Sequence, residues 1–337
     1  MEIENKIKQF RDDFLKLKTE IHKAIVGNEE IIELVLVSLL ANGHVLLEGV
    51  PGLGKTYLVK TLAESLSLGF SRIQFTPDLM PADIIGTTIV NEEDSRKVFT
   101  FQKGPVFSNI ILADEINRAT PKTQSALLEA MQEHTVTVSG KKHDLPAPFI
   151  VLATQNPIEM EGTYPLPEAQ LDRFFFKVLV KPPEMKSLIE IINRTTGESL
   201  PAISPVLTGD SIREMQRFAR TVPVPEHVKE YAARVILATH PETEHAPDTT
   251  RKFLRFGSSP RGCQTLISGA KVLALQSGRS NVSFADIRRV AAPALRHRII
   301  LNFEGEAEGI TPDSIVESVL REVPELPQRV EEILKNK

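Results

Sequence analysis

Residues 49–56 read Gly-Val-Pro-Gly-Leu-Gly-Lys-Thr and match the full phosphate-loop pattern GxxxxGK followed by Ser or Thr. The stretch follows an apolar run at 44–47, which predicts a strand, and precedes an amphipathic pattern at 59–66, which predicts a helix. In this setting the N–H groups at the start of the helix point toward bound phosphate oxygens. The sequence therefore predicts a phosphate-binding loop, with a glycine-rich turn that matches by chance as the alternative.

Each residue type in this loop has a physical reason to be there. Gly49, Gly52 and Gly54 permit backbone angles that other residues resist. Lys55 would reach the β and γ phosphates, and the Thr56 hydroxyl would bind Mg²⁺. We expect a nucleoside triphosphate with magnesium to be held by Gly49, Val50, Pro51, Gly52, Leu53, Gly54, Lys55 and Thr56.

The regions on either side of the loop alternate between strand and helix patterns. Residues 1–25 carry apolar side chains at helical spacing, and 31–41 are apolar nearly all round, as in a helix packed inside a layered domain. Short runs rich in Ile, Val, Leu and Phe, separated by helical stretches, indicate a parallel sheet covered on both faces. The sequence therefore predicts an α/β fold, with further strands at 72–75, 109–113, 149–154 and 174–180.

After Lys181-Pro182-Pro183 the strand pattern disappears, and the rest of the chain reads as helices. Ser211 with Glu214, and Ser283 with Asp286, are typical helix starts, and Gly278 is typical of a helix end. We expect an N-terminal helix at 1–25, an α/β domain at 26–182 and an all-α domain at 183–337. The predicted helices are 184–194, 211–221, 226–239, 260–276, 284–298 and 313–323.

Composition excludes several classes of protein. The 337 residues suffice for about two domains, and 40 Lys and Arg against 44 Asp and Glu give a net charge of −4, which disfavours a histone-like or coat-like nucleic-acid binder. The single cysteine, Cys263, allows no internal disulfide and no CxxC metal site, and the eight scattered histidines indicate no zinc chemistry. Residues 1–11 are charged, and no apolar run approaches the length of a membrane span. We expect no signal peptide, no membrane span and a cytoplasmic protein.

Two acids follow the apolar run Ile110-Ile-Leu-Ala, at Asp114 and Glu115. The carboxyl ends of parallel strands are where open α/β sheets bind ligands. Asp114 would hold the Mg²⁺ shell, and Glu115 would orient and deprotonate the attacking water. A solvated strand end is the alternative.

Three more polar residues occupy comparable positions. Asn156 follows the strand at 149–154 and could donate to the γ phosphate or the water, although an Asn before a proline also forms turns. Arg173 lies before a buried strand, where it could stabilise a transferred phosphoryl group or simply pair with Asp172. Arg261 lies in the first turn of a helix, where a cation opposes the helix dipole; a nearby anion would explain it, and a tolerated surface arginine is the alternative.

In this order, followed by a helical domain, these residues resemble those of AAA+ ATPases. Asp-Glu-Ile-Asn-Arg-Ala at 114–119 and Gly-Thr-Tyr-Pro-Leu-Pro-Glu-Ala-Gln-Leu-Asp-Arg-Phe at 162–174 resemble the signature of the MoxR family, and the resemblance runs from about Val26 to Arg298. It implies a five-stranded parallel sheet and a hexameric ring. It also implies an adenine pocket at Val26 and Gly27, Asn156 as sensor 1, Arg173 as an arginine finger acting on the neighbouring subunit's nucleotide, and Arg261 as sensor 2 from the lid.

Two stretches predict hairpins. Residues 87–101 alternate around a polar turn at 91–96, and 135–145 alternate around Ser139-Gly140. They resemble the helix-2 insert and pre-sensor-1 hairpin shared by MoxR proteins and magnesium chelatase ATPase subunits. Surface hairpins without a function of their own are the alternative.

The resemblance implies a chaperone that remodels, matures or activates client proteins, commonly with a von Willebrand factor A domain partner. Such partners bind metal through a DxSxS motif, which this sequence lacks, so the partner would be a separate polypeptide. Residues 78–86 offer no aromatic-apolar-Gly pore loop, only Ile84-Ile85-Gly86, which speaks against processive threading of substrates.

Two other functions remain open. The hairpins also occur in nucleic-acid motors; Arg288-Arg289 and Arg296-His297-Arg298 could contact nucleic acid, although a solvated helix face fits an acidic chain better. In a nucleotide-gated scaffold, ATP would only order the ring and Glu115 would be dispensable. The intact acid pair argues against the scaffold.

Overall fold

The computed structural model describes residues 2–93, 96–157, 162–197 and 201–326. Contacts divide the chain into two compact units. The sheet unit comprises Asp13–Phe174 and Val178–Glu214, and the helical unit comprises Met1–Asp12, Phe175–Lys177 and Met215–Lys337. The sequence-based domain boundaries, after residues 25 and 182, stay predictions.

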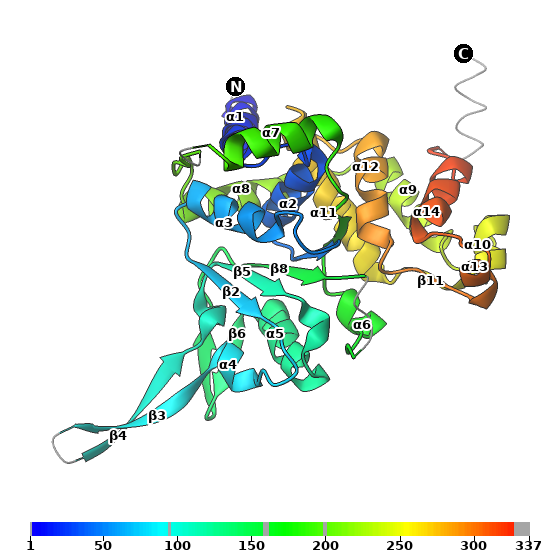
Figure 1. The fold of residues 1–337 in the computed structure, drawn as a ribbon. Coiled ribbons are helices and arrows are strands. Elements are labelled where there is room, and N and C mark those ends of the chain that lie inside the picture. The colour runs from blue at the N-terminus through cyan, green and yellow to red at the C-terminus, as the bar shows by residue number, and fades with distance from the viewer. Residues whose placement is uncertain (1, 94–95, 158–161, 198–200, 327–337) are drawn as a thin grey trace, which may run out of the picture. The chain divides into compact units, whose positions relative to one another are not determined.

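A five-stranded parallel sheet of order β2-β5-β8-β1-β9 carries the α/β fold, as predicted (Figure 1). Its three inner strands, β5, β8 and β1, are buried at every residue except the last, which is why they read as continuous apolar runs. Those last residues lie at the carboxyl edge of the sheet. The strands are β1 (Val45–Glu48), β2 (Phe70–Gln74), β5 (Ile110–Asp114), β8 (Ile150–Gln155) and β9 (Phe176–Leu179).

Helices precede the sheet and lie in the segments between its strands. The apolar stripe of the N-terminal region lies on α1, and the helix after the phosphate loop is α3. Short 3-10 turns occur at η1 (Pro105–Phe107) and η2 (Ile116–Arg118). The helices before residue 222 are α1 (Glu2–Ala24), α2 (Glu29–Leu40), α3 (Lys55–Ser65), α4 (Pro81–Ile85), α5 (Pro121–Glu133), α6 (Glu168–Leu171), α7 (Met185–Thr195) and α8 (Gly209–Thr221).

Both predicted hairpins are present. Strands β3 (Gly86–Glu93) and β4 (Arg96–Lys103) form a long ribbon that projects away from the sheet, and β6 (Thr135–Val138) pairs with β7 (Lys141–Asp144) (Figure 1). The two hairpins touch near the base of the ribbon, where the Phe101 and His143 rings stack with centroids 4.1 Å apart. Farther out, the cross-strand pair Val90 and Phe99 is exposed.

The helical unit contains four of the six helices expected after residue 183, those predicted at 226–239, 260–276, 284–298 and 313–323. The helix expected at 184–194 lies in the sheet unit and the one expected at 211–221 begins there, while two short helices, Asp248–Phe253 and Phe303–Ala307, were not predicted. A two-stranded antiparallel sheet joins β10 (Leu254–Phe256) to β11 (Ile300–Leu301), where no strand was predicted. Strands of two or three residues are too short to show an alternating pattern. The helices are α9 (Glu226–Leu237), α10 (Asp248–Phe253), α11 (Pro260–Gln276), α12 (Phe284–Leu295), α13 (Phe303–Ala307) and α14 (Pro312–Glu322).

Two of the predicted helix-boundary signals lie at helix ends in the structure, and one predicted helix start does not. Ser283 and Asp286 form a capping box at the start of α12, and Gly278 follows α11 in the left-handed conformation. The predicted start at Ser211 is wrong. Helix α8 begins at Gly209, because the Thr208 hydroxyl accepts the Ser211 N–H at 3.2 Å and so caps the first turn.

His44 connects the core of the sheet unit through both ring nitrogens. Its Nδ1 accepts the Val151 N–H at 3.0 Å, so Nε2 carries the proton and donates to the Met131 carbonyl at 3.0 Å. The residue is buried, and burial is the main cause that lowers its pKa from 6.5 to about 4, with the neighbouring His134 acting in the same direction. His44 is therefore neutral in the folded protein at pH 7.

Acidification is expected to weaken the fold through His44. The folded-state pKa lies below the unfolded value, so the unfolded chain binds the extra proton; the stabilising contribution is complete above pH 6.5 and is lost as the pH falls toward 4, by roughly 3 kcal/mol at most. Urea unfolding of the wild type and His44→Gln measures this effect. The difference in unfolding free energy between them should shrink as the pH falls, and a constant difference would contradict the assignment.

Candidate functional site

The phosphate loop bends between β1 and α3 at two glycines. Gly52 and Gly54 have φ values of 82° and 75°, in the left-handed region that favours glycine. Gly49 is needed for another reason. A Cβ there would lie 2.7 Å from the Val180 carbonyl oxygen, so this position requires glycine for a close backbone approach, and the predicted unusual backbone angle is wrong.

We expect Gly49→Ala to disturb the loop severely. Backbone and the Val180 Cβ, at 2.9 Å, both block the added methyl, so the strand end or the loop must shift. Overpacking of this kind costs about 1–3 kcal/mol, measurable by urea unfolding, and should also weaken nucleotide binding. Gly197→Ala is the matched control, because its nearest atom is 3.5 Å away. Equal stability of the two variants would contradict this account of Gly49.

Lys55 begins α3, and its ammonium donates to the Gly49 carbonyl at 2.6 Å. Partial burial lowers the pKa of Lys55, while the nearby carboxylates of Asp114 and Glu115 act in the opposite direction. Thr56 follows directly in the first turn of α3.

Asp114 ends β5 and is held from both neighbouring strands. Thr154 in β8 donates its hydroxyl to Oδ1 at 2.6 Å, and Arg72 in β2 donates to Oδ2 from Nη2 at 2.6 Å and from Nε at 3.1 Å. Carboxylate and hydroxyl oxygens such as those of Asp114 and Thr56 are ligands that Mg²⁺ prefers. This donor set therefore fits the predicted metal when substrate phosphates and water supply the remaining ligands.

Glu115 stands immediately after the strand in a left-handed conformation, with φ 56°. Such strain at a non-glycine residue is typical of functional sites. Its N–H donates to the Thr154 hydroxyl at 2.8 Å, and its Oε2 accepts from Gln74 Nε2 and from Arg118 Nη1, both at 3.1 Å. The carboxylate is thus held in a defined position as an acceptor.

Asn156 is buried just beyond β8. Because β8 lies between β1 and β5, the end of β8 separates the phosphate loop from the acid pair. The Gly49 N–H donates to the Gln155 carbonyl at 3.2 Å, which joins the loop to this strand end. The structure therefore brings Asn156 to the same edge of the sheet as Lys55, Asp114 and Glu115.

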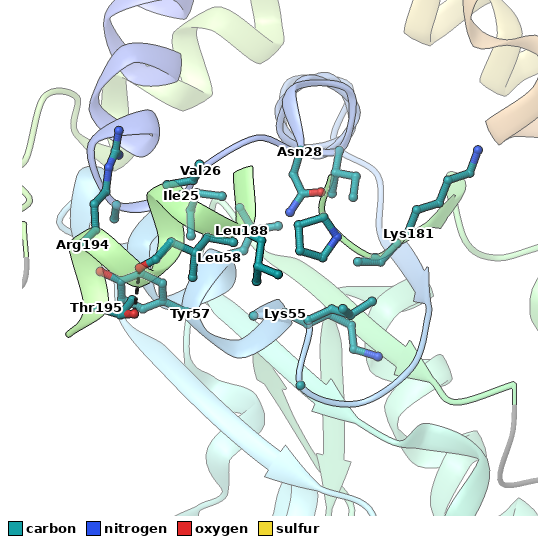
Figure 2. Close-up of a pocket in the computed structure, with 18 residues that line it drawn as sticks. Ile25, Val26, Asn28, Lys55, Tyr57, Leu58, Lys181, Leu188, Arg194 and Thr195 are labelled. Carbon is teal, nitrogen blue, oxygen red and sulfur yellow. Dashed lines mark hydrogen bonds between the residues drawn. The ribbon is translucent and has the colours of Figure 1, made fainter. Parts of the chain in front are cut away.

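A cavity of about 380 Å³ opens beside the phosphate loop (Figure 2). Val26 and Asn28 enter it from the segment between α1 and α2, and Leu188 enters it from α7. Gly27 lies between Val26 and Asn28 in the sequence, with φ 67°. A Cβ added at Gly27 would lie 3.0 Å from Ser187 Oγ, which is a tight contact. The predicted residues that line it are Val26, Gly52, Leu53, Gly54 and Lys55, and the apolar lining also includes Ile25, Ile31, Leu58, Leu188 and Ile191.

The two predicted arginines lie in different units. Arg173 follows α6 in the sheet unit, and its Nη1 donates to the Leu128 carbonyl of α5 at 2.8 Å. Arg261 lies in the first turn of α11 in the helical unit, as predicted, where it is exposed and its N–H donates to Ser259 Oγ at 3.2 Å. The catalytic roles of both arginines stay predictions.

Sequence reasoning missed several residues that shape the site. Arg72, Gln74, Thr154 and Arg118 contact the acid pair, and α7 supplies part of the cavity wall. One signal was available for Gln74: it is polar at the end of a strand, and register pairs it with Asp114. The sequence-based prediction assigns the helix at 184–194 to the all-α domain, whereas α7 lies in the sheet unit.

Two structural observations bear on wider classes of function. Across the described ranges, no helix is long and apolar enough to cross a membrane. No cluster of three or more His, Cys, Asp or Glu side chains that could hold a metal ion occurs in that same part of the chain.

Comparisons with known proteins give a consistent result. Residues 44–176 match a family described as ATPase family associated with various cellular activities (AAA), and 248–319 match an AAA lid domain. Chaperone MoxR1 of Mycobacterium tuberculosis is 46% identical over 310 residues, 92% of this chain and 81% of the relative. An uncharacterized Bacillus subtilis protein, YeaC, is 42% identical over 317 residues, 93% of this chain and 95% of the relative.

A solved structure agrees with these relatives. A crystal structure from Cytophaga hutchinsonii, of a protein assigned as an ATPase, superposes with a TM-score of 0.89 at 41% identity. It covers 96% of this chain and 98% of its own. The similarity therefore extends over both units of the fold.

Proposed function

Because the chain belongs to the MoxR family of AAA+ ATPases, we propose that it hydrolyses ATP with Mg²⁺ to remodel, mature or activate client proteins. The observation that carries the hydrolytic part is the strand order, in which β1, β8 and β5 end side by side at the carboxyl edge of the sheet. This order brings the phosphate loop with Lys55 to the same edge as Asp114 and Glu115, beside an apolar cavity suited to a nucleotide base. The chaperone part rests on the similarity to the mycobacterial relative, which is named a chaperone.

Each residue of the site has a role in this proposal. Val26 and Gly27 contact the adenine, and Gly49, Val50, Pro51, Gly52, Leu53 and Gly54 surround the phosphates with Lys55. Mg²⁺ held by Thr56 and Asp114 would neutralise charge on the phosphates. Glu115 accepts a proton from the attacking water, and Asn156 donates a hydrogen bond to the γ phosphate or to that water.

The proposal extends to assembly. Arg173 acts as an arginine finger on the nucleotide of the adjacent subunit, and Arg261 acts as sensor 2 from the lid, so hydrolysis requires a ring of this chain, which we propose to be a hexamer. A separate protein with a von Willebrand factor A domain is the proposed partner, and the cytoplasm the proposed location. The exposed pair Val90 and Phe99 on the projecting hairpin gives such a protein an apolar contact.

A direct test measures phosphate release by the purified protein. Release is expected with ATP and magnesium, and it should stop when magnesium is chelated. Added DNA or RNA should leave the rate unchanged, because stimulation that falls with salt would favour a nucleic-acid motor instead. A pulldown with Glu115→Gln in ATP should then retain the client that the wild type releases. Failure to bind or hydrolyse adenine nucleotides would contradict the proposal.

A further inference from the structure

Gln124 joins two segments of the sheet unit that are distant in sequence. The residue is fully buried in the first turns of α5. The two N–H groups of its Nε2 are shared among three carbonyls, those of Ile116 at 3.2 Å, Ala119 at 3.1 Å and Tyr164 at 2.9 Å. Ile116 and Ala119 lie one and four residues after Glu115, and Tyr164 lies nine residues before Arg173. One amide group therefore holds the chain on both sides of the site.

On the Glu115 side, Gln124 fixes the turn that presents the carboxylate. Glu115 caps η2, and the Arg118 N–H returns to the Glu115 carbonyl at 2.9 Å. Ile116 and Ala119, whose carbonyls accept from Gln124, are fully buried in the same apolar cluster. The left-handed conformation of Glu115 is thus stabilised by the packing of Ile116 and Ala119 and by the side-chain amide of Gln124.

On the Arg173 side, the connection is longer and runs from Tyr164 through α6 to Arg173. The Tyr164 N–H donates to the Asn117 carbonyl at 2.7 Å, so 116–119 and 164 are joined by backbone as well as by Gln124. Leu166 packs in the same cluster, α6 follows, and the Arg173 N–H donates to the Gln170 carbonyl at 3.2 Å. Arg173 then returns to α5 through the Leu128 carbonyl, one turn beyond Gln124.

Packing alone does not account for an amide at this position. Gln124 Oε1 is buried and has no hydrogen-bond partner among the described residues. An apolar side chain of similar size would avoid that desolvation cost, but it would leave the buried carbonyls of Ile116 and Ala119, and the partly buried carbonyl of Tyr164, without this donor. The donor function is therefore what the position requires.

We propose that Gln124 is a positioning residue: it holds the two segments that carry Glu115 and Arg173 in fixed positions relative to α5. The catalytic glutamate of one ATP site and the finger that serves the adjacent site are then fixed together, so a displacement at either one is transmitted to the other. This inference rests on the proposed function, in which Arg173 acts on the neighbouring subunit.

The variant Gln124→Met removes the donor and keeps nearly the same volume. We expect kcat for ATP to fall about 10-fold or more while KM and the affinity for a non-hydrolysable analogue stay within about twofold, because the adenine and phosphate contacts are untouched. A residue needed only for packing would lower thermal stability without this split. Lys122→Met, exposed on the same helix, is the matched control and should behave as wild type.

Mixed rings separate the two effects. In the reference mixture, Glu115→Gln subunits donate the finger and Arg173→Ala subunits hydrolyse. Placing Gln124→Met in the Glu115→Gln subunit tests the finger alone, and placing it in the Arg173→Ala subunit tests the glutamate alone. Both mixtures should lose about 5-fold or more of the reference turnover, as expected for displaced catalytic groups.

The results of these experiments distinguish failure of the joint positioning from failure of the action of Arg173 between subunits. If either mixture equals the reference, or if ATP affinity falls along with kcat, the joint positioning of the two groups is overturned. If wild-type rings hydrolyse but the reference mixture does not, the action of Arg173 between subunits fails, and the Arg173 half of this inference fails with it. Should Gln124→Met not fold, Gln124→Asn keeps an amide that is one methylene too short, and the same criteria apply.

Discussion

The variant Glu115→Gln is expected to bind MgATP as the wild type does and to lose about 10²- to 10⁴-fold in the rate of phosphate release, the usual contribution of a general base. Glutamine keeps the size of the side chain but cannot accept the proton of the attacking water. Its contacts also persist in part, because an amide oxygen can still accept from Gln74 and Arg118. Phosphate release at saturating ATP, with analogue binding measured in parallel, tests this.

The control for this variant is Glu64→Gln, which makes the same change on the exposed side of α3, where Glu64 pairs with Lys60 at 3.7 Å. It should retain full turnover, since exposed ion pairs contribute little. Near-normal hydrolysis by Glu115→Gln would move the base to another residue. Loss of hydrolysis with an intact biological output would instead favour the nucleotide-gated scaffold.

The centre of the sheet could be predicted from the sequence because its three inner strands, β5, β8 and β1, are buried on both faces. Each of these strands is a run of apolar residues that lies between helical patterns or turns, so local sequence carries the information. The β10–β11 pair could not be predicted, because two or three residues paired across the chain leave no periodic pattern. The start of α8 was misread because Thr208 and Ser211 are both capable caps, and only the fold selects one.

The residues of the candidate site likewise include some that the sequence predicts and some that it does not. The phosphate loop and the acid pair are contiguous motifs, so their residue types and spacing reveal them. Arg72, Thr154 and Gln124 act through hydrogen bonds to residues that lie elsewhere in the sequence, and none belongs to a recognisable pattern. Their roles follow only from strand register and from the packing of α5, which the sequence does not state.

Arg173→Ala is expected to lower turnover about 10³-fold or more, the effect of removing an arginine that stabilises charge on a transferred phosphoryl group. ATP affinity should change little, because Arg173 acts on the neighbouring subunit's nucleotide in the proposed ring. Arg173→Lys should recover only part of the rate, since an ammonium group lacks the planar fork of the guanidinium. Turnover at saturating ATP is the measurement, and thermal unfolding shows whether loss of the Leu128 contact harms the fold.

Mixing variants then decides whether the arginine acts between subunits. Lys55→Ala subunits cannot bind nucleotide productively but keep Arg173, and Arg173→Ala subunits keep an intact phosphate loop. A mixture of the two inactive proteins should regain turnover wherever an intact arginine faces an intact loop. Arg213→Ala, a surface change on α8 that removes an ion pair with Asp210, should stay active by itself and so control for charge loss. If mixed rings form but regain no turnover, Arg173 acts only within its own subunit. Its role would then be structural, through the hydrogen bond to the Leu128 carbonyl of α5.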